Sequence, residues 1–375
     1  MVTLLATELE AKQRVARLLG LMEKDGLDLL VAYSDAHKPD NVFYLTGYNL
    51  SAGDAWASLN QNGECNLWVS EEWDLERVVR DSWAVRVEPV RNLLGLGSKL
   101  GQGSRKIGLA GKDLVPSHYE KKMGWLLSQA SSANSLLERA ALVKTREEVE
   151  LVKRASTIAD IGFARALQTA RPGIREFELL AEMELAMRLA GATDNFQLMS
   201  SGTHNLGMVV GREKQLATGE LLLFEITPTI SSFTYAAQLC RTIFMGEADK
   251  ELLAKYEILV KAMDAARSVI RPGIPFKEIC RVQDEVVGAA GYSKYCGPPY
   301  MRTRGHGFGL AQSFNLDGDN SVLMESGMVV VVHPNQYLPE TGYLALGEMV
   351  VVTENGCEGL SNTEAKLFCV SEGIQ

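Results

Sequence analysis

The tetrapeptide Arg-Pro-Gly-Ile occurs twice in this chain, at 171–174 and again at 271–274, and it constrains the fold of the second half. Each copy lies between two segments with the pattern of a long amphipathic helix. In both halves the second of these segments ends at an Ala-Gly pair, at 190–191 and 290–291. Proline and glycine at such places are typical of turns and ends of helices. A chance recurrence of a common turn sequence is the alternative, but the matching helices on both sides favour a duplication.

A β-rich segment follows each predicted helix pair, over 198–246 in the first half and 300–356 in the second. Two halves of this kind, each a helix pair with strands, predict a pseudo-symmetric α+β domain with one shared curved sheet.

The length of 375 residues exceeds that of most single cores, so two domains are expected. Thr145 and Glu148 form a T-x-x-E capping box that opens a long helix. Before it, a helix over Glu8 to Asp25 and strands at 27–33, 41–47, 65–70, 84–90 and 106–111 predict a smaller α/β domain. We therefore predict an amino-terminal domain over 1–138 and the duplicated domain over 139–375.

The net charge of -9 argues against nucleic acid as a main partner, because phosphate binding needs a basic surface. The chain contains no apolar run of eighteen residues, and its first residues continue into a charged helix. These features predict a cytoplasmic protein without a membrane partner. The six cysteines contain no CxxC pair, which favours reduced, mostly buried thiols.

Ligand-type side chains interrupt apolar runs that read as buried strands: Glu225 in LLLFEIT, His333 in MVVVVHP and Glu348 in LALGEMVVV. A buried carboxylate or imidazole is costly unless it is paired, hydrogen-bonded or bound to a metal. His306 in RGHGFGL and Gln238 in YAAQLCRT complete a set of five. Because the set divides between the two halves, we expect one internal site at their junction.

The segments SSGTHN, GELLLFEITP, AAQLCRTIFMG, GHGFGL, ESGMVVVVHPNQY and GEMVVVTENG resemble, in order and spacing, the pita-bread family of aminopeptidase P, prolidase, methionine aminopeptidase and creatinase. The first 135 residues resemble the amino-terminal domain of the creatinase, prolidase and aminopeptidase P branch. The resemblance implies a pita-bread catalytic domain preceded by a smaller α/β domain.

The resemblance also implies a metal site whose residues are altered here. The family's peptidases hold two ions with two aspartates, a histidine and two glutamates. Carried over position by position, the aspartates fall on Glu225 and Gln238, the histidine on His306, and the glutamates on His333 and Glu348. Only His306 and Glu348 keep the family's residue type.

The charge of this set favours one divalent ion over two, because it offers two carboxylates against the four of the peptidases. His306, His333 and Glu348 would form a two-histidine, one-carboxylate face suited to Fe, Zn, Mn or Ni, with Glu225 as a further ligand. A metal-free polar pocket is one alternative, since the related creatinase works without metal. A two-ion site is the other alternative.

The acid-base group is also altered, because the family's catalytic histidine falls on Met208 or Val209, which are inert. His204 on the same segment could replace it, although a histidine beside a turn can equally bond the backbone. Arg302 and Arg304 could clamp a substrate carboxylate, or they could pair with acidic residues of a neighbouring loop. Gln238 is assigned to substrate binding.

These features predict a hydrolase that cleaves a C–N bond in a small amino-acid-derived or non-standard substrate. Glu225 and Glu348 would position water or a cationic group, and His306 and His333 would bind metal or carry protons. The alternatives are a metal-dependent Xaa-Pro aminopeptidase or dipeptidase, a mononuclear-metal lyase or oxygenase, and a non-catalytic binding protein. The resemblance further implies a homodimer acting on a small molecule.

Overall fold

The computed structural model describes residues 8–93, 106–230, 235–308, 312–316 and 318–371. It divides into two compact units, one formed by the described residues up to Thr145 and the other beginning at Arg146. The predicted boundary between 138 and 139 falls inside helix α6 (Asn134–Leu142). Helix α6 packs against α1 (Glu8–Asp25) of the first unit, which explains why that unit extends past residue 138.

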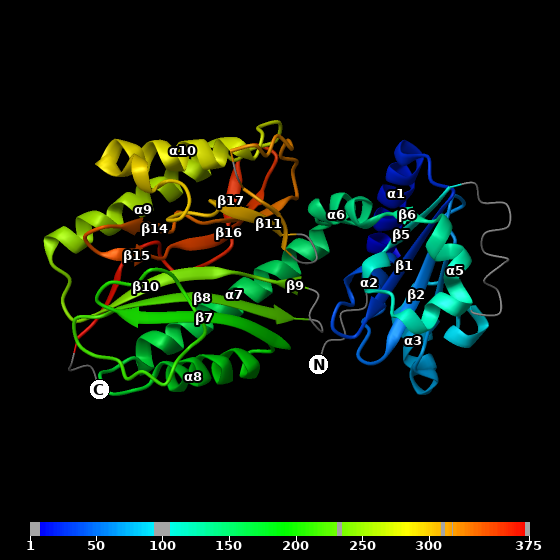
Figure 1. Cartoon of the computed structure of the whole chain (residues 1–375), viewed down its shortest axis with the longest axis horizontal. Coiled ribbons are helices and arrows are strands. Elements are labelled where there is room, and N and C mark those ends of the chain that lie inside the picture. Colours follow the sequence, from blue (N-terminus) through cyan, green and yellow to red (C-terminus); the bar gives the residue numbers. More distant parts are fainter. Residues whose placement is uncertain (1–7, 94–105, 231–234, 309–311, 317, 372–375) are drawn as a thin grey trace. The chain divides into compact units, whose positions relative to one another are not determined.

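The first unit is built on a six-stranded sheet with the order β4-β3-β2-β1-β5-β6. Strands β1, β2, β5 and β6 are labelled in Figure 1. Strand β1 pairs antiparallel with β2 and parallel with β5. The strands are β1 (Leu29–Asp35), β2 (Asp54–Asn60), β3 (Cys65–Val69), β4 (Arg86–Pro89), β5 (Ile107–Ala110) and β6 (Ser131–Ser132). Besides α1 and α6, the α-helices whose full bounds lie within the described residues are α2 (Asp40–Thr46), α3 (Leu75–Asp81) and α5 (Glu120–Gln129), with short 3₁₀ turns η1 (Glu72–Asp74), η2 (Lys112–Leu114) and η3 (Ser117–Tyr119).

Residues 41–47 were expected to form a strand, and the structure corrects this: they belong to helix α2, which ends at Gly47. Every residue from Val42 to Thr46 is buried, so the segment lacks the polar positions that reveal a helical period. Gly47 has a φ of 71°, the left-handed conformation in which helices commonly end.

The second unit joins two helix pairs to a ten-stranded sheet whose main order is β12-β11-β13-β16-β10-β8-β7. Its α-helices are α7 (Arg146–Thr169), α8 (Glu176–Leu189), α9 (Lys250–Val269) and α10 (Lys277–Val287), followed by η4 (Gly288–Tyr292) and η5 (Ser293–Tyr295). The sheet contains β7 (Asp194–Gly202), β8 (Leu221–Ile230), β9 (Tyr235–Ala236), β10 (Leu239–Met245), β11 (Gly305–Phe308), β12 (Gln312–Asn315), β13 (Val329–Val332), β16 (Gly347–Val352), β17 (Cys357–Gly359) and β18 (Phe368–Val370). Strands β14 (Gln336–Leu338) and β15 (Gly342–Leu344) form a separate hairpin. None of the described helices is both long enough and apolar enough to cross a membrane.

The two Arg-Pro-Gly-Ile turns make equivalent hydrogen bonds. Gly173 donates to the carbonyl of Leu216 at 2.9 Å, and Gly273 donates to the carbonyl of Met324 at 2.9 Å. Both glycines have positive φ, 88° and 83°, which explains why the turn requires glycine. Each turn is thereby fixed to the strand-forming segment of its own half.

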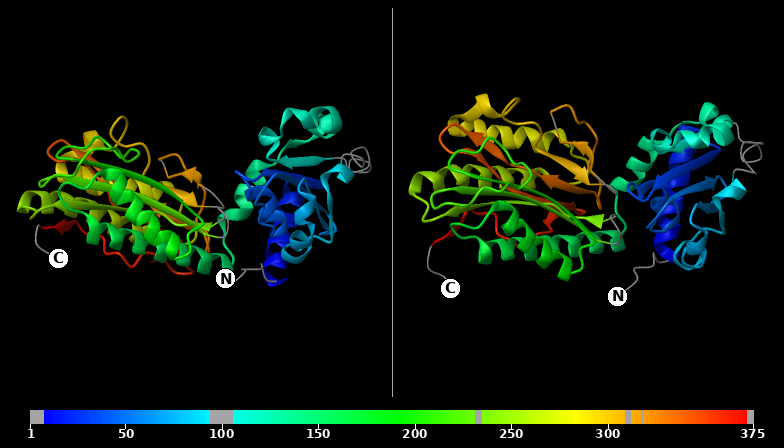
Figure 2. Two further views of the ribbon diagram at one scale, coloured as in Figure 1. Left: turned by 90° about the horizontal axis from the view of Figure 1, so that it is seen from below. Right: turned by 60° about the horizontal axis from the view of Figure 1, so that its bottom comes forward.

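Helices α7 and α8 lie along β7 and β8, as the green elements of Figures 1 and 2 show. Phe163 of α7 packs edge to face against Phe224 of β8, with ring centroids 6.1 Å apart. We call the face of the sheet that carries Phe224 the helix face, and the opposite face the site face.

Candidate active site

The five polar residues expected at the site come from five neighbouring strands in the middle of the sheet, in the order β11-β13-β16-β10-β8. Three of them lie within strands, and each of the other two is adjacent in sequence to the end of a strand. They are His306 on β11, His333 after β13, Glu348 on β16, Gln238 before β10 and Glu225 on β8.

The strand register decides which of these side chains share a face. Glu225 follows Phe224 and therefore belongs to the site face. Cys240 of β10 lies opposite both Glu225 and Gly347, and directly opposed residues share a face. Gly347 thus stands on the site face, and its neighbour Glu348 points to the helix face.

The position of Glu348 contradicts its predicted role as a catalytic residue and metal ligand. Its carboxylate is 1% exposed, and both oxygens accept hydrogen bonds from arginines. Arg241 Nη2 donates to Oε2 at 3.0 Å, and Arg267 of α9 donates to Oε1. The expected face of His306, His333 and Glu348 does not form, because Glu348 stabilises the other side of the sheet.

A compact donor cluster on the site face contains Glu225, His333 and a residue that sequence reasoning missed, Cys240. One ligand atom from each of the three lies within 4.8 Å of the other two. Cys240 Sγ is 3.7 Å from Glu225 Oε2 and 3.6 Å from His333 Nδ1. The available signal was that Cys240 stands two residues after Gln238, on the same side of one strand.

His306 reaches this cluster through Gln238. The Gln238 side chain hydrogen-bonds to Glu225, and its Oε1 accepts a 2.7 Å hydrogen bond from His306 Nε2. The structure therefore brings four of the five predicted residues together, with Gln238 lying between Glu225 and His306.

Burial sets the protonation of the cluster. It raises the pKa of Glu225 and, more strongly, that of the Cys240 thiol. It lowers the pKa of His306 to about 4 and that of His333 to about 3, so both imidazoles are neutral at neutral pH. Neutral imidazole is the form that binds metals.

Two more residues near the cluster were absent from the predicted set. The side-chain nitrogen of Asn335 is 3.3 Å from His333 Nδ1. Tyr343 of β15 interacts with Asn335, and burial and the nearby Cys240 and Glu225 raise the pKa of its phenol. Asn335 lies two residues after His333, and Tyr343 returns to Asn335 through the turn between β14 and β15.

Arg304 does not have the predicted substrate-clamping role. It is 1% exposed, and it forms a salt bridge with Asp284 of α10 at 2.7 Å. It also donates to the carbonyl of Asn335 and to Gln336 Oε1. The alternative of pairing with a nearby acidic residue therefore describes Arg304, whereas Arg302 is exposed and its role stays a prediction.

His204 lies on the exposed loop after β7, and its Nε2 is 3.2 Å from the hydroxyl of Tyr337 on β14. The two rings meet edge to face. It lines a surface groove with neighbouring loop residues such as Thr203 and Asn205, and Glu225, Cys240 and His333 are not part of that groove. Its catalytic role stays a prediction without a described contact to the cluster.

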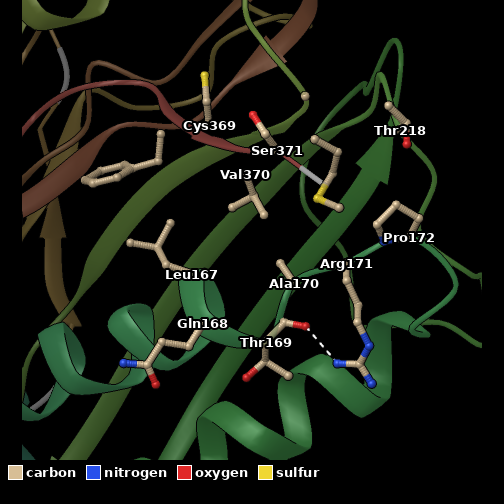
Figure 3. A pocket seen from close by; sticks show the side chains of 13 residues that line it. Leu167, Gln168, Thr169, Ala170, Arg171, Pro172, Thr218, Cys369, Val370 and Ser371 are labelled. Atoms are coloured by element: carbon tan, nitrogen blue, oxygen red, sulfur yellow. Dashed lines mark hydrogen bonds between the residues drawn. The ribbon is translucent and has the colours of Figure 1, made fainter. Parts of the chain in front are cut away.

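A separate cavity of about 710 Å³ lies where the end of α7 meets β18 (Figure 3). Leu167, Ala170 and Val370 give it an apolar wall, and Arg171 of the first repeat turn borders it with its guanidinium bonded to the carbonyl of Thr169. None of the predicted site residues lines this cavity, so it is distinct from the donor cluster.

Residues 150–354 match the model of metallopeptidase family M24, and residues 14–149 match the creatinase/prolidase N-terminal domain. The chain belongs to metallopeptidase family M24. This membership confirms the predicted pita-bread fold, with its smaller amino-terminal domain, and the predicted hydrolase class.

Individual relatives differ in how much of the chain they cover. The Xaa-Pro dipeptidase of Pyrococcus furiosus is 24% identical over 366 residues, covering 95% of this chain and 100% of that protein. The uncharacterized peptidase YqhT of Bacillus subtilis is 30% identical over 237 residues, covering 62% and 65%. The solved Xaa-Pro dipeptidase from Bacillus anthracis superposes with a TM-score of 0.83 at 23% identity, covering 96% of this chain and 100% of that one.

The donor groups on the site face fit one metal ion and do not fit two. With Glu348 on the helix face, the cluster offers one carboxylate, one thiol and one imidazole. Glu225 and a deprotonated Cys240 supply two negative charges, which balance a single divalent ion. Two such ions would carry four positive charges into a buried environment, where unbalanced charge is costly.

Proposed function

We propose that the protein hydrolyses a C–N bond of a small amino-acid-derived substrate at the cluster of Glu225, Cys240 and His333. One observation carries this proposal. Glu225 is a largely buried carboxylate whose described partners, Gln238 and Cys240, are both without positive charge. A carboxylate retained under such conditions is typical of a site that receives a cation from outside the chain.

Glu225 and His333 would hold one divalent ion, which supplies, when bound, a water molecule of lowered pKa as the nucleophile. Gln238 orients His306 because its Oε1 accepts a hydrogen bond from the Nε2–H group. Since burial keeps that imidazole neutral, we assign His306 as the group that accepts and returns a proton during turnover. Gln238 acts here as a positioning residue.

The substrate class follows from two considerations. The relatives include Xaa-Pro dipeptidases, which supports a substrate of dipeptide size. The cluster has a single carboxylate where the family's peptidases use four, which supports a substrate other than an ordinary Xaa-Pro dipeptide. The homodimer and the small-molecule partner remain part of the proposal.

The test is a hydrolysis screen with three compound classes: dipeptides ending in proline, creatine-like guanidines and cyclic amidines. We expect turnover of at least one class, reduced about a hundredfold or more in Glu225→Gln, equivalent to about 2.7 kcal/mol of activation free energy. Glu257→Gln, on the exposed surface of α9, is the matched control and should retain full turnover.

Full activity in folded Glu225→Gln would exclude the cluster as the catalytic site. Thermal stabilisation by a compound that is never hydrolysed would instead identify a binding protein.

A further inference from the structure

Cys240 occupies a bridging position between Glu225 and His333. Its sulfur is 3.7 Å from the carboxylate oxygen and 3.6 Å from the imidazole nitrogen. A neutral thiol has one proton and can donate to only one of them. With the thiol donating to Glu225 Oε2, the contact with His333 Nδ1 is a hydrogen bond only if that nitrogen carries the ring proton.

The two distances match the spacing of ligands around one tetrahedral ion. With bonds of about 2.3 Å to sulfur and about 2.0 Å to nitrogen or oxygen, the sulfur lies about 3.5 Å from each other ligand. All three donor atoms are already within 4.8 Å of one another.

His333 presents an unprotonated nitrogen to the cluster. The backbone N–H of Leu346 donates to Asn335 Oδ1 at 2.7 Å, which fixes the orientation of that amide. Its NH₂ group is therefore the side that faces His333 Nδ1, 3.3 Å away. The Nδ1 atom accepts a hydrogen bond, so the ring proton of the neutral imidazole is on Nε2.

Gly347 keeps space beside this nitrogen. A Cβ atom at position 347 would lie 2.6 Å from His333 Nδ1, too close for any other residue without movement. Asn335 also hydrogen-bonds to the Cys240 thiol, an interaction that stabilises the thiolate. The cluster thus has a donor triad, an outer hydrogen-bond partner and no side chain at position 347.

We propose that Glu225, Cys240 and His333 form a mononuclear metal site with a thiolate ligand, selective for Zn²⁺ or Co²⁺ over Mn²⁺, with water as the fourth ligand. Thiolate and imidazole ligands favour zinc-like ions, whereas sites built from carboxylates favour manganese or magnesium. The proposal rests on the one-ion part of the proposed function and adds Cys240 to it. Metal binding is measured separately from hydrolysis, so either can fail without the other.

The test begins with the purified, metal-depleted full chain titrated with Co²⁺. We expect one equivalent to bind and to produce a thiolate-to-cobalt charge-transfer band in the near ultraviolet. Cys240→Ser should remove the band and weaken Zn²⁺ binding more than about a hundredfold, because losing an outer partner alone costs about 10–100-fold. Cys369→Ser, which changes an exposed thiol, is the matched control and should retain both.

X-ray absorption at the zinc edge of the unsubstituted protein gives a decisive measurement even where Cys240→Ser fails to fold. We expect a single sulfur scatterer at about 2.3 Å together with nitrogen and oxygen scatterers. A shell without sulfur, a charge-transfer band that survives in Cys240→Ser, or two equivalents of bound ion would each overturn the proposal.

Discussion

Two carboxylates on opposite faces of one sheet, Glu348 and Glu225, have opposite surroundings. Glu348 on the helix face accepts hydrogen bonds from Arg241 and Arg267, so its charge is neutralised within the chain. Glu225 on the site face contacts Gln238 and Cys240, neither of which is a cation. The comparison distinguishes a carboxylate that stabilises the fold from one for which we propose a partner from outside the chain.

The largest expected effect is on stability, from Glu348→Ala. Removing one partner of a buried ion pair leaves the arginines uncompensated and costs about 3–5 kcal/mol of unfolding free energy. Glu358→Ala is the matched control, because Glu358 is exposed and pairs with Lys153 at 3.2 Å on the surface. That change should cost less than about 1 kcal/mol. Denaturant unfolding measures both, and equal losses would remove the distinction between the faces.

The next largest effect is on the unfolding free energy of the metal-depleted protein at acidic pH, through His306 on the site face. The pKa of His306 is lowered from 6.5 to about 4 in the folded state, so below pH 6.5 the unfolded chain binds the proton more readily. Stability therefore falls as the pH drops, by about 2 kcal/mol at pH 5 from this residue.

His306→Gln should remove the contribution of His306 to the decrease in unfolding free energy between pH 7 and pH 5. Urea unfolding at each pH measures this decrease. His37→Gln, on an exposed residue of the first unit, should leave it in place. An unchanged pH profile in His306→Gln would show that the imidazole is solvated in the folded protein.

A smaller effect is expected from Glu225→Gln on the stability of metal-depleted protein at pH 7. Burial raises the pKa of this carboxyl, so a neutral amide of the same shape removes a penalty. We expect the unfolding free energy to stay within about 1 kcal/mol of the original or to rise. A loss as large as that of Glu348→Ala would mean that Glu225 also has a structural cation partner.

The smallest expected effect on stability is from Arg302→Ala, within about 0.5 kcal/mol, because Arg302 is exposed. If it binds a substrate carboxylate, KM rises with little change in kcat, whereas Arg304→Ala breaks the buried pair with Asp284 and lowers the melting temperature. Steady-state kinetics combined with thermal melts separates the two arginines. An unchanged KM in Arg302→Ala would end its assignment to substrate binding.

Much of the fold was predictable because its signals are local. The capping box at Thr145 correctly marked the start of α7 at Arg146, and the proline-glycine turns marked the break between the two helices of each pair. Helix α2 was missed because it is buried on all sides, which removes the amphipathic period. Local signals fail wherever burial is uniform.

The site was predictable in part for the same reason. Glu225, His306 and His333 stood out as polar residues in apolar strands, and the structure places them near one another together with Gln238. Cys240 did not stand out, because a cysteine in an apolar strand is indistinguishable from a small hydrophobic residue.

By itself, the sequence determined the duplicated α+β domain, the family membership and the strands that meet at the site, since each depends on residue order and spacing. The tertiary structure decided which residue of each strand faces the site. Gly347 and Glu348 are adjacent and both buried, and a shift of one residue moves a side chain to the opposite face. Only the pairing of β10 with β8 and β16 fixes that choice, placing Cys240 beside Glu225 and Glu348 among the arginines.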